Sequence, residues 1–592
     1  MIDVLAVPHA ASLSFPNTSP LPSNGNAYTM DKRTESACDQ CHGHKLKCSP
    51  QPQGCVRCKR LRIRCTSDRP IKKRGRKSTR KETPLSPTVP SDALDYPVLD
   101  CLHDLSILKP DKEHARNSTI HLTRYEACRL LEHFFTSPNQ EFHALLIRRE
   151  RLLNQRAPRP TEPTLLLSLL CVACFMPSDE SSALPESTSK ERAALGRYLF
   201  DKLSHYFHPR TLPGANHVFD DALTAFIMTS ISPSEQSVES SLHYWLAFLK
   251  FIVQELQLYK DSPILSEDDR EERRRLWWAS YIIDRHVALS FNERPHIPDQ
   301  ECQLLPTPSP DAVWVLPGPL LRSPEINFQG TMLGYRVKSL DMLGIYLPLS
   351  KILGEILEHR FLCEHPTFNK NEKFLAEIKS NILQNLEQWF NSFIGLAGPD
   401  FYTIATPECT LPPPPNIPKV AYYGLHMYHC MFVLLHGPMD IVRMYKDHAW
   451  QASSDFIIAG EHAVACANVA RYILQVDPRL CLMYRFFGTY FLQSSFIFLI
   501  LARKLGRQSD ELIMRNCAIN LQVLDKFVAT TNMDYQHTFA KFIRRALSYN
   551  MGQPSSEDDI HLDNPLAESL DPESLPYRWI PGYRGATGWS DE

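Results

Sequence analysis

The stretch from residue 38 to residue 65 reads CDQCHGHKLKC, then SPQPQG, then CVRCKRLRIRC, and it contains the spacing C-x2-C-x6-C twice. Random placement almost never repeats both gaps. Zinc prefers four soft ligands such as thiolates in a tetrahedron. The doubled spacing therefore predicts a metal-binding module from about residue 37 to residue 66. Its expected ligands are Cys38, Cys41, Cys48, Cys55, Cys58 and Cys65.

The number of cysteines indicates how the metal would be held. Two zinc ions need eight ligand positions, so six thiolates suffice only if two sulfurs are shared between the ions. Two ions of charge +2 with six thiolates leave a net charge of −2, which nearby cations would stabilise. The expected cofactor is therefore two zinc ions per chain. The nearby cations are Lys45, Lys47, Arg57, Lys59, Arg60, Arg62 and Arg64.

Two other interpretations of these cysteines are weaker. Residues 38–42 also match C-x-x-C-H, the attachment pattern of c-type haem, but haem leaves four regularly spaced cysteines unexplained. A disulfide framework is typical of small secreted chains, whereas this chain has 592 residues and shows no secretory start. Since six thiolates complete both sites, His42 and His44 are expected to face solvent or phosphate.

The charge distribution favours a polyanion as partner for one end of the chain. Residues 31–82 hold 17 Lys and Arg against 5 Asp and Glu, a local net charge of +12, although the whole chain carries −2. A basic module on an acidic body is expected to bind double-stranded DNA. Lys45, and then Lys47, are the candidates to contact guanine O6 and N7 in the major groove. Phosphate contacts are expected from Arg57, Lys59 and Arg60.

Residues 67–98 are predicted to form a basic, Pro-rich linker. Its basic centre is too charged to bury and is expected to follow the DNA backbone or to serve as a nuclear import signal. A merely solvated linker is the alternative. No sustained heptad pattern follows the cysteines, so a coiled coil there is not supported, and the choice between monomer and dimer stays open. The basic residues are Lys72, Lys73, Arg74, Arg76 and Lys77.

Residues 120–550 are predicted to form a large all-α domain, so the fold class is mostly α. The clearest helix starts near Ser266, where Ser266 and Asp269 resemble a capping box, and Pro295 ends the run. Acid-to-base pairs at i,i+4 join Asp269 to Arg273 and Glu271 to Arg275. Further helices are expected over Leu242–Leu258, Leu340–Arg360, Asn371–Phe393, Val420–His436, Phe456–Leu474, Tyr484–Leu505 and Asp510–Thr531.

Some residues of this domain look like site residues but are assigned to its core. Trp277, Trp278 and Asp284 lie on an amphipathic helix, where such residues usually pack into the core. Cys171 and Cys174 form an isolated C-x-x-C in an apolar run, without basic neighbours to activate them. The uncharged stretch Phe486–Ala502 is at the lower limit for a membrane span and is interpreted as a buried core helix.

Both ends of the chain are predicted to lie outside packed domains. Residues 1–36 are rich in Pro, Ser and Asn, lack a basic targeting segment and are expected to be disordered. Residues 551–592 are predicted to be an acidic tail. Within it, Glu557–Leu575 holds seven acids and interspersed leucines, which is typical of an activation segment that contacts the transcription machinery or co-regulators. A plain solvated tail is the alternative.

The cysteine stretch resembles the DNA-binding domain of fungal binuclear zinc-cluster transcription factors. In that family the first and fourth cysteines bridge the two ions. The resemblance therefore implies that Cys38 and Cys55 are the bridges. It also implies that Cys41 and Cys48 complete one site and that Cys58 and Cys65 complete the other.

The body carries a second resemblance. Residues 271–278 (EERRRLWW), 281–285 (YIIDR), 294–295 and 298–299 are similar to the fungal-specific transcription factor domain. Leu347-Pro348-Leu349, residues 352–356 and Tyr577-Arg578-Trp579 resemble the xylanolytic activator subgroup, which switches on plant-polysaccharide and pentose utilisation genes. The resemblance implies a regulatory body that senses metabolic state and restrains activation, with a small-molecule inducer as a candidate partner.

These observations lead to one functional hypothesis. The chain is expected to be a nuclear, sequence-specific regulator of RNA polymerase II transcription, an activator of carbohydrate utilisation genes and not an enzyme. One alternative is a regulator of a secondary-metabolite gene cluster, and another is an enzyme tethered to DNA by a zinc module. The sequence shows no phosphate-binding glycine loop, G-x-S-x-G or H-E-x-x-H motif. No membrane partner is expected.

Overall fold

The computed structural model divides the chain into two compact units, Met1–Thr88 and Val89–Glu592. The predicted segment 1–36, most of the predicted linker and the acidic segment Glu557–Leu575 lie outside the described residues. The structure describes residues 38–43, 48–49, 55–66, 95–103, 105, 107–109, 122–137, 141–176, 188–212, 214–231, 242–320, 333–406, 409, 411–483, 487–505, 511–531, 534–551 and 577–587.

The described part of the first unit is built around its cysteines. It contains two five-residue helices, α1 (Asp39–Gly43) and α2 (Val56–Arg60). Its buried side chains, among the residues described, are those of Cys38, Cys41, Cys55 and Cys58. No aliphatic or aromatic side chain is buried in this described part. Its interior is formed by the cysteine side chains instead of a hydrophobic core.

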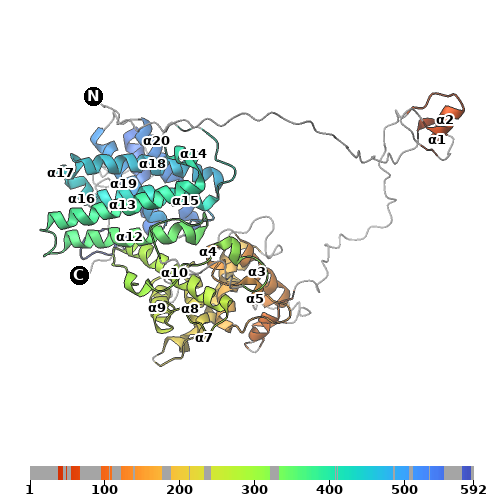
Figure 1. Ribbon diagram of the computed structural model, residues 1–592, viewed down its shortest axis with the longest axis horizontal. Helices are drawn as coiled ribbons and strands as arrows, with labels where there is room; N and C mark the ends of the chain where they lie inside the picture. The colour runs from red at the N-terminus through yellow and green to blue at the C-terminus, as the bar shows by residue number, and fades with distance from the viewer. Residues whose placement is uncertain are drawn as a thin grey trace, which may run out of the picture. The chain divides into compact units, whose positions relative to one another are not determined.

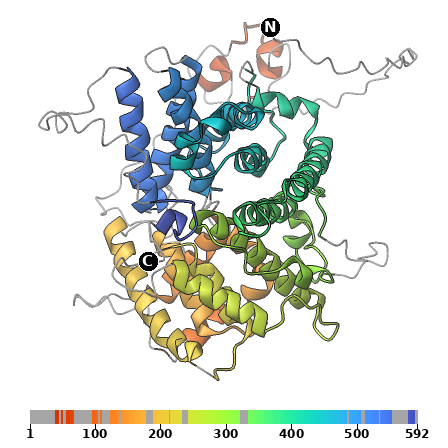
Figure 2. The same ribbon diagram turned by 90° about the vertical axis from the view of Figure 1, so that its left-hand side faces the viewer.

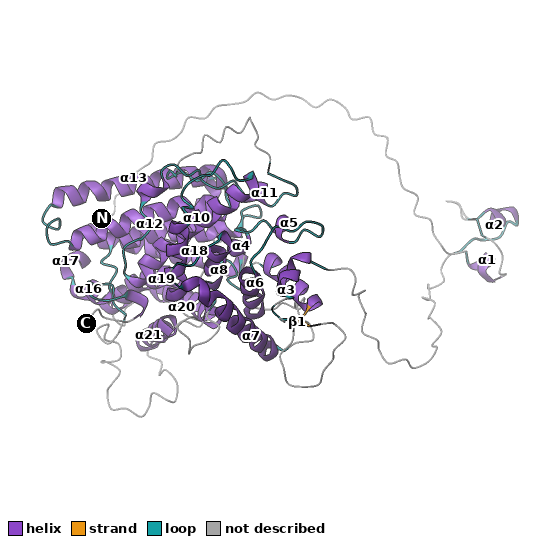
Figure 3. Cartoon of the chain, turned by 90° about the horizontal axis from the view of Figure 1, so that it is seen from below, coloured by secondary structure: helices purple, strands orange, loops and turns teal. Residues whose placement is uncertain are grey.

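The second unit is mostly α-helical, as predicted (Figure 3). In Figures 1 and 2, the helices from α3 to α10 form one half of this body, and those from α12 to α20 form the other. Its α-helices are α3 (Arg124–Thr136), α4 (Glu141–Ala144), α5 (Arg149–Leu152), α6 (Pro163–Phe175), α7 (Ser189–Phe207), α8 (Phe219–Met228), α9 (Leu242–Glu255), α10 (Glu267–Phe291), α11 (Asp311–Trp314), α12 (Met342–Glu364), α13 (Glu372–Ala397), α14 (Pro399–Tyr402), α15 (Lys419–His436), α16 (Ile441–Lys446), α17 (His448–Gln451), α18 (Ser454–Val476), α19 (Phe487–Leu505), α20 (Glu511–Thr531) and α21 (Asp534–Met551).

Short elements connect these helices. Strands β1 (Leu108–Lys109) and β2 (Leu122–Thr123) pair in parallel, with Leu108 opposite Leu122. Thr123 also caps α3 in a capping box with Glu126. The 3-10 helices are η1 (Pro97–Leu102), η3 (His208–Thr211), η5 (Asp299–Cys302), η6 (Thr403–Ala405) and η10 (Gly585–Thr587).

Helix α10 begins at the predicted cap. The Ser266 hydroxyl accepts a hydrogen bond from the Asp269 N–H (3.2 Å). The helix ends at Asn292, whose left-handed backbone (φ 57°) stops it before Pro295. Of the two predicted ion pairs, Glu271 with Arg275 is present at 3.1 Å. The prediction for Asp269 was wrong, because Asp269 pairs with Arg151 of α5 at 2.5 Å.

The other predicted helices match observed ones with shifted ends. Their counterparts are α9, α12, α13, α15, α18, α19 and α20. Helix α6 is buried on all sides, and it packs against α3, α7 and α8. In the other half, α15 packs mainly against α18, and α12 packs against α10, α13 and α15. The side chains between these helices form one continuous hydrophobic core.

Helix α19 is a core helix, as expected for the stretch Phe486–Ala502. Tyr490, Phe491 and Ser494 are fully buried. Polar contacts also join this helix to α10 in the other half. The hydroxyls of Ser290 and Thr489 lie 2.8 Å apart, and His286 Nδ1 lies 2.6 Å from the Tyr490 hydroxyl. Within the described residues, no helix has the length and apolar character needed to span a bilayer.

The far end of the predicted acidic tail is packed against the body. We call residues 577–587 the clasp. Trp579 is completely buried, and its indole N–H donates to the Leu289 carbonyl of α10 (2.8 Å). The Asn292 amide donates to the carbonyls of Ile580 and Tyr583. The tail prediction therefore needs correction for these residues, because their aromatic side chains complete the core.

The body also starts earlier than the predicted residue 120. Pro97, which was assigned to the linker, is the first residue of η1. Leu99 and Leu102 of this element are fully buried, and Tyr96 is nearly so. Arg124 fixes the segment to α3 through Asp95 (2.5 Å) and Asp100 (2.7 Å). Residues 95–103 thus belong to the second unit.

Candidate metal centre and nucleic-acid interface

Each half of the cysteine pattern starts a short helix. Helix α1 follows Cys38 directly, and α2 follows Cys55. Cys55 is the N-cap of α2, and its sulfur accepts a hydrogen bond from the Cys58 N–H (3.4 Å). One turn of helix places the second cysteine of each C-x2-C beside the first. The spacing thus turns both sulfurs of a pair toward the same point.

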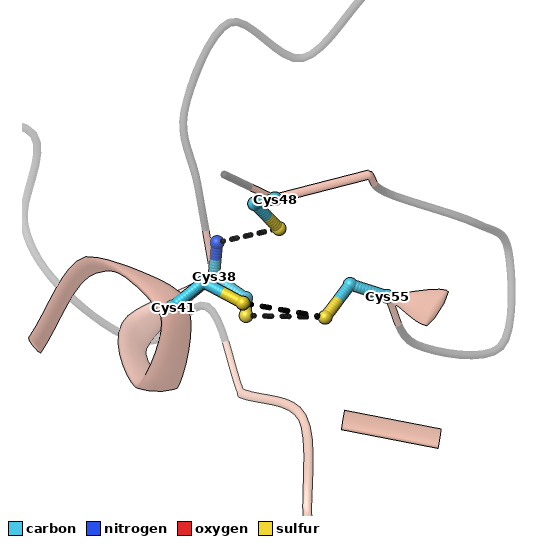
Figure 4. Close-up of side chains that lie close together, drawn as sticks. All are labelled: Cys38, Cys41, Cys48 and Cys55. Carbon is cyan, nitrogen blue, oxygen red and sulfur yellow. Dashed lines mark hydrogen bonds between the residues drawn. The ribbon is translucent and has the colours of Figure 1, made fainter. Parts of the chain in front are cut away.

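The sulfurs of the two halves meet in one cluster (Figure 4). The Cys55 sulfur lies 3.6 Å from those of Cys38 and Cys41, and the Cys38 sulfur lies 3.8 Å from that of Cys58. A tetrahedral zinc site with Zn–S bonds of about 2.3 Å has sulfurs about 3.8 Å apart. A disulfide would need about 2.05 Å. The cluster therefore fits a metal and does not fit disulfides.

The cluster contains two overlapping groups of four ligands. One consists of Cys38, Cys41, Cys48 and Cys55, and the other of Cys38, Cys55, Cys58 and Cys65. In each group the ligand atoms all lie within 4.8 Å of one another. Cys38 and Cys55 occur in both, and they are the pair that the family resemblance implies as bridges. Two metal ions that share these two sulfurs would use all six cysteines.

Hydrogen bonds make the two shared sulfurs the most acidic of the cluster. The backbone N–H of Cys58 lowers the pKa of Cys55 to about 6, and the backbone N–H of Cys41 lowers the pKa of Cys38. Burial raises the pKa of Cys41 to about 12 and also raises that of Cys58. The shared pair thus favours the thiolate form that metals bind, and metal binding at Cys41 and Cys58 would release protons.

The two halves are related by an approximate two-fold symmetry. The Cys38 N–H donates to the Cys48 sulfur (3.5 Å), and the Cys55 N–H donates to the Cys65 sulfur (3.3 Å). Between the halves, the Asp39 N–H donates to the Thr66 carbonyl (2.9 Å), and the Val56 N–H donates to the Ser49 carbonyl (3.2 Å). Each of these four bonds thus has its counterpart at an offset of 17 residues.

Only some of the predicted DNA contacts fall within the described residues. Arg57, Lys59 and Arg60 lie in the last turn of α2, where Lys59 and Arg60 are exposed and Arg57 is half-buried. Beyond α2, the exposed residues Arg62 and Arg64 extend this basic surface. The sequence predicts these two arginines only as cations that stabilise the charge of the cluster, not as DNA contacts. Lys45, Lys47 and the basic run 72–77 lie outside the described residues.

The site-like residues of the body have structural roles. Trp277 and Trp278 are fully buried in the core. Asp284 accepts hydrogen bonds from the backbone N–H groups of His296 (2.8 Å) and Ile297 (2.9 Å). Although burial opposes it, the His296 side chain, the nearby cations Lys250 and Arg285, and the Ile297 N–H lower the pKa of Asp284. The carboxylate thus fixes the chain that follows α10.

The body's C-x-x-C pair has the properties of core thiols. Cys171 and Cys174 are both buried in α6. Burial raises the pKa of Cys174 to about 12 and raises that of Cys171 well above its usual value. Both side chains therefore stay protonated and unreactive at neutral pH.

Comparison with known proteins finds similarity across much of the body. Residues 131–391 match the fungal specific transcription factor domain. The chain is 32% identical to the xylanolytic transcriptional activator of Aspergillus clavatus over 320 residues, which are 49% of this chain and 32% of that protein. It is 28% identical to the arabinolytic transcriptional activator of Emericella nidulans over 355 residues, or 54% of this chain and 42% of that protein.

A second xylanolytic transcriptional activator, from Emericella nidulans, is 30% identical to this chain over 322 residues, which are 49% of this chain and 35% of that protein. The chain thus spans between about a third and two fifths of the length of these relatives. No solved structure matches the chain.

Proposed function

We propose that the chain is a nuclear, sequence-specific transcription factor that acts on RNA polymerase II promoters, because residues 131–391 match the fungal specific transcription factor domain. The sulfur cluster is its DNA-binding module, and the helical body is its regulatory domain. The observation that carries this proposal is the pair of four-cysteine groups that share Cys38 and Cys55. A module of this kind on a chain with this body is the combination expected of a DNA-bound regulator.

In this proposal two zinc ions fold the DNA-binding module. Cys41 and Cys48 bind one ion, Cys58 and Cys65 bind the other, and both ions share the two remaining cysteines. The ions supply the folding free energy, which for structural zinc in small peptides is about 10–16 kcal/mol. This contribution is needed because the described part of the module buries no apolar side chain.

DNA recognition follows from the basic residues around the cluster. Lys45, with Lys47 beside it, contacts guanine edges. The α2 residues Arg57, Lys59 and Arg60 contact phosphates, which set the register without reading sequence. Residues 72–77 serve nuclear import or contact the DNA backbone. The acidic segment Glu557–Leu575 recruits the transcription machinery or co-regulators.

The regulated genes are proposed to serve carbohydrate utilisation. Relatives named as xylanolytic and arabinolytic activators support this pathway over a secondary-metabolite cluster. Genome-wide mapping of bound promoters tests it directly. Enrichment at pentose or plant-polysaccharide genes is expected, whereas enrichment confined to one secondary-metabolite cluster would overturn the assignment.

Zinc content and DNA binding of the full chain test the module. Wild type is expected to hold two zinc ions by elemental analysis and to bind promoter DNA in a salt-sensitive way. Cys55→Ser removes a ligand from both groups and should lower the zinc content at both sites. Cys65→Ser removes a ligand from one group and should spare the other ion. Cys363→Ser, at an exposed cysteine of the body, is the matched control.

Two outcomes would contradict this proposal. One is wild-type protein that holds well under two zinc ions yet binds its promoter DNA normally. The other is an equal loss of zinc in Cys55→Ser and Cys65→Ser, since a shared and an unshared ligand must then be equivalent.

A further inference from the structure

The approximate two-fold symmetry of the sulfur cluster makes the two halves of the module comparable residue by residue. At an offset of 17 residues, Cys38 corresponds to Cys55 and Cys48 to Cys65. The residues before the third cysteine then also correspond: Lys45-Leu46-Lys47 in one half and Arg62-Ile63-Arg64 in the other. Both halves therefore carry a cation, an aliphatic residue and a second cation directly before the third cysteine of their sequence pattern.

We propose that Arg62, Ile63 and Arg64 form a second DNA-contact site, through which the module binds a second segment of duplex DNA while Lys45 and Lys47 occupy the first. This inference rests on the proposed DNA-binding function. It adds a site in the half of the module to which only phosphate contacts from α2 were assigned.

The three side chains are available for a ligand. Arg62 and Arg64 are exposed, and Ile63 keeps 44% of its surface accessible. Neither guanidinium has an ion-pair or hydrogen-bond partner among the described residues of the module. Guanidinium groups bind phosphate oxygens or guanine edges through two parallel hydrogen bonds. An aliphatic side chain between them suits a thymine methyl group or a sugar.

The backbone at Arg62 favours a functional role for its side chain. The Arg62 N–H donates to the Lys59 carbonyl (3.3 Å), and the Ile63 N–H donates to the Cys58 carbonyl (3.1 Å). These bonds form a Schellman motif, which places Arg62 in the left-handed region at φ 52°. Glycine is preferred there, and other residues cost about 1–2 kcal/mol. The helix end by itself would favour glycine at this position, so the end of the helix does not explain why an arginine stands there.

This geometry supplies a variant that separates folding from DNA binding. Arg62→Gly removes the cation but gives the left-handed position the residue it favours. The double variant Arg62→Gly/Arg64→Ala should therefore keep the wild-type zinc content. It should still bind one duplex at its preferred site, because Lys45 and Lys47 are unchanged.

The experiment mixes the full chain with two short promoter duplexes that carry different fluorophores. Sedimentation then measures the number of duplexes per chain. Wild type should bind two at low salt, and Arg62→Gly/Arg64→Ala should bind one. The logarithm of the second binding constant should fall as the logarithm of the salt concentration rises, with a slope of about −2 for two phosphate contacts. Lys45→Ala/Lys47→Ala is the matched variant, which should lose the specific site and keep the other.

The outcomes distinguish the two proposals. Wild-type protein that binds one duplex per chain overturns the second site but leaves the proposed function intact. The same is true if the arginine variant still holds two duplexes per chain, because the second duplex then binds elsewhere on the chain. A weaker first binding event in the arginine variant would place these arginines in the primary interface. Wild-type protein that binds no duplex overturns the proposed function itself.

Discussion

The ion pair between Asp440 and Arg578 should control whether the clasp stays on the body. Asp440 is fully buried and caps α16 by accepting the Arg443 N–H (3.0 Å). It also accepts two bonds from the Arg578 guanidinium (2.8 and 2.9 Å) and one from the Trp579 N–H (3.0 Å). Removing the guanidinium leaves the carboxylate buried without its ion-pair partner.

The expected cost follows from this burial. Breaking a buried ion pair by removing one partner costs about 3–5 kcal/mol. Since the remaining N–H groups still stabilise the carboxylate, we expect Arg578→Ala to fall at the lower end, about 3 kcal/mol. A difference of about 1.4 kcal/mol corresponds to a factor of ten in an equilibrium constant. The population of the open clasp should therefore rise by about 100-fold.

Hydrogen exchange of the full chain measures this opening. The Trp579 N–H donates to Asp440, and the Gly585 N–H donates to the Arg578 carbonyl (3.0 Å), so both amides report on the closed clasp. Their exchange should accelerate about 100-fold in Arg578→Ala. Arg584→Ala is the matched control, because Arg584 pairs with Glu293 at the surface (3.4 Å). Exposed pairs contribute only about 0.2–1 kcal/mol.

The double variant Asp440→Ala/Arg578→Ala makes the test sharper. Once both charges of the pair are removed, the buried carboxylate that lacked its partner is gone. The clasp amides of the double variant should therefore exchange more slowly than the sum of the two single effects predicts. Acceleration below tenfold in Arg578→Ala would refute this reasoning. An equal effect of Arg584→Ala would do the same, because the change would then reflect the loss of any arginine from the clasp.

Three further predictions concern pH, the clasp backbone and the metal. Burial lowers the pKa of His143, His286 and His426 to about 3 each. The unfolded chain binds protons below about pH 6.5 while these folded groups do not. Stability in urea should therefore fall as pH drops from 6.5 toward 3, by up to about 1.4 kcal/mol per pH unit for each histidine, and His426→Leu should reduce that slope. Gly585→Ala should loosen the clasp in the same exchange assay, since φ is +48° and the new Cβ would lie 2.3 Å from the Ser290 carbonyl oxygen. A zinc chelator should abolish DNA binding and leave the helical circular dichroism of the body almost unchanged, because the body has its own apolar core.

Local chemistry explains what could be predicted from the sequence. The start of α10 depends on the hydroxyl of Ser266 and an N–H three residues away, and both can be read from adjacent positions. The grouping of the cysteines is local in the same sense, since 27 positions separate Cys38 from Cys65 and the helical turns bring each pair together. The apolar periodicity likewise indicated the long helices of the second half.

Contacts between distant segments could not be predicted in this way. Asp269 has a suitable arginine four residues later, yet it pairs with Arg151, 118 residues earlier, because the packing of α5 brings that guanidinium closer. Trp579 follows the acidic residues 557–575, and this composition predicted a solvated tail. Its partner Leu289 is 290 residues away. The sequence contains no local sign of either contact.

The two units are stabilised by different interactions, and this difference decides how each can be controlled. The described part of the first unit buries only cysteine side chains, so under the proposed function its folding depends on metal and on the deprotonation of thiols. The body is instead stabilised by a continuous apolar core, which the clasp closes. We therefore expect loss of zinc to remove DNA binding without unfolding the body. Opening of the clasp is expected to alter the body and to leave the sulfur cluster intact.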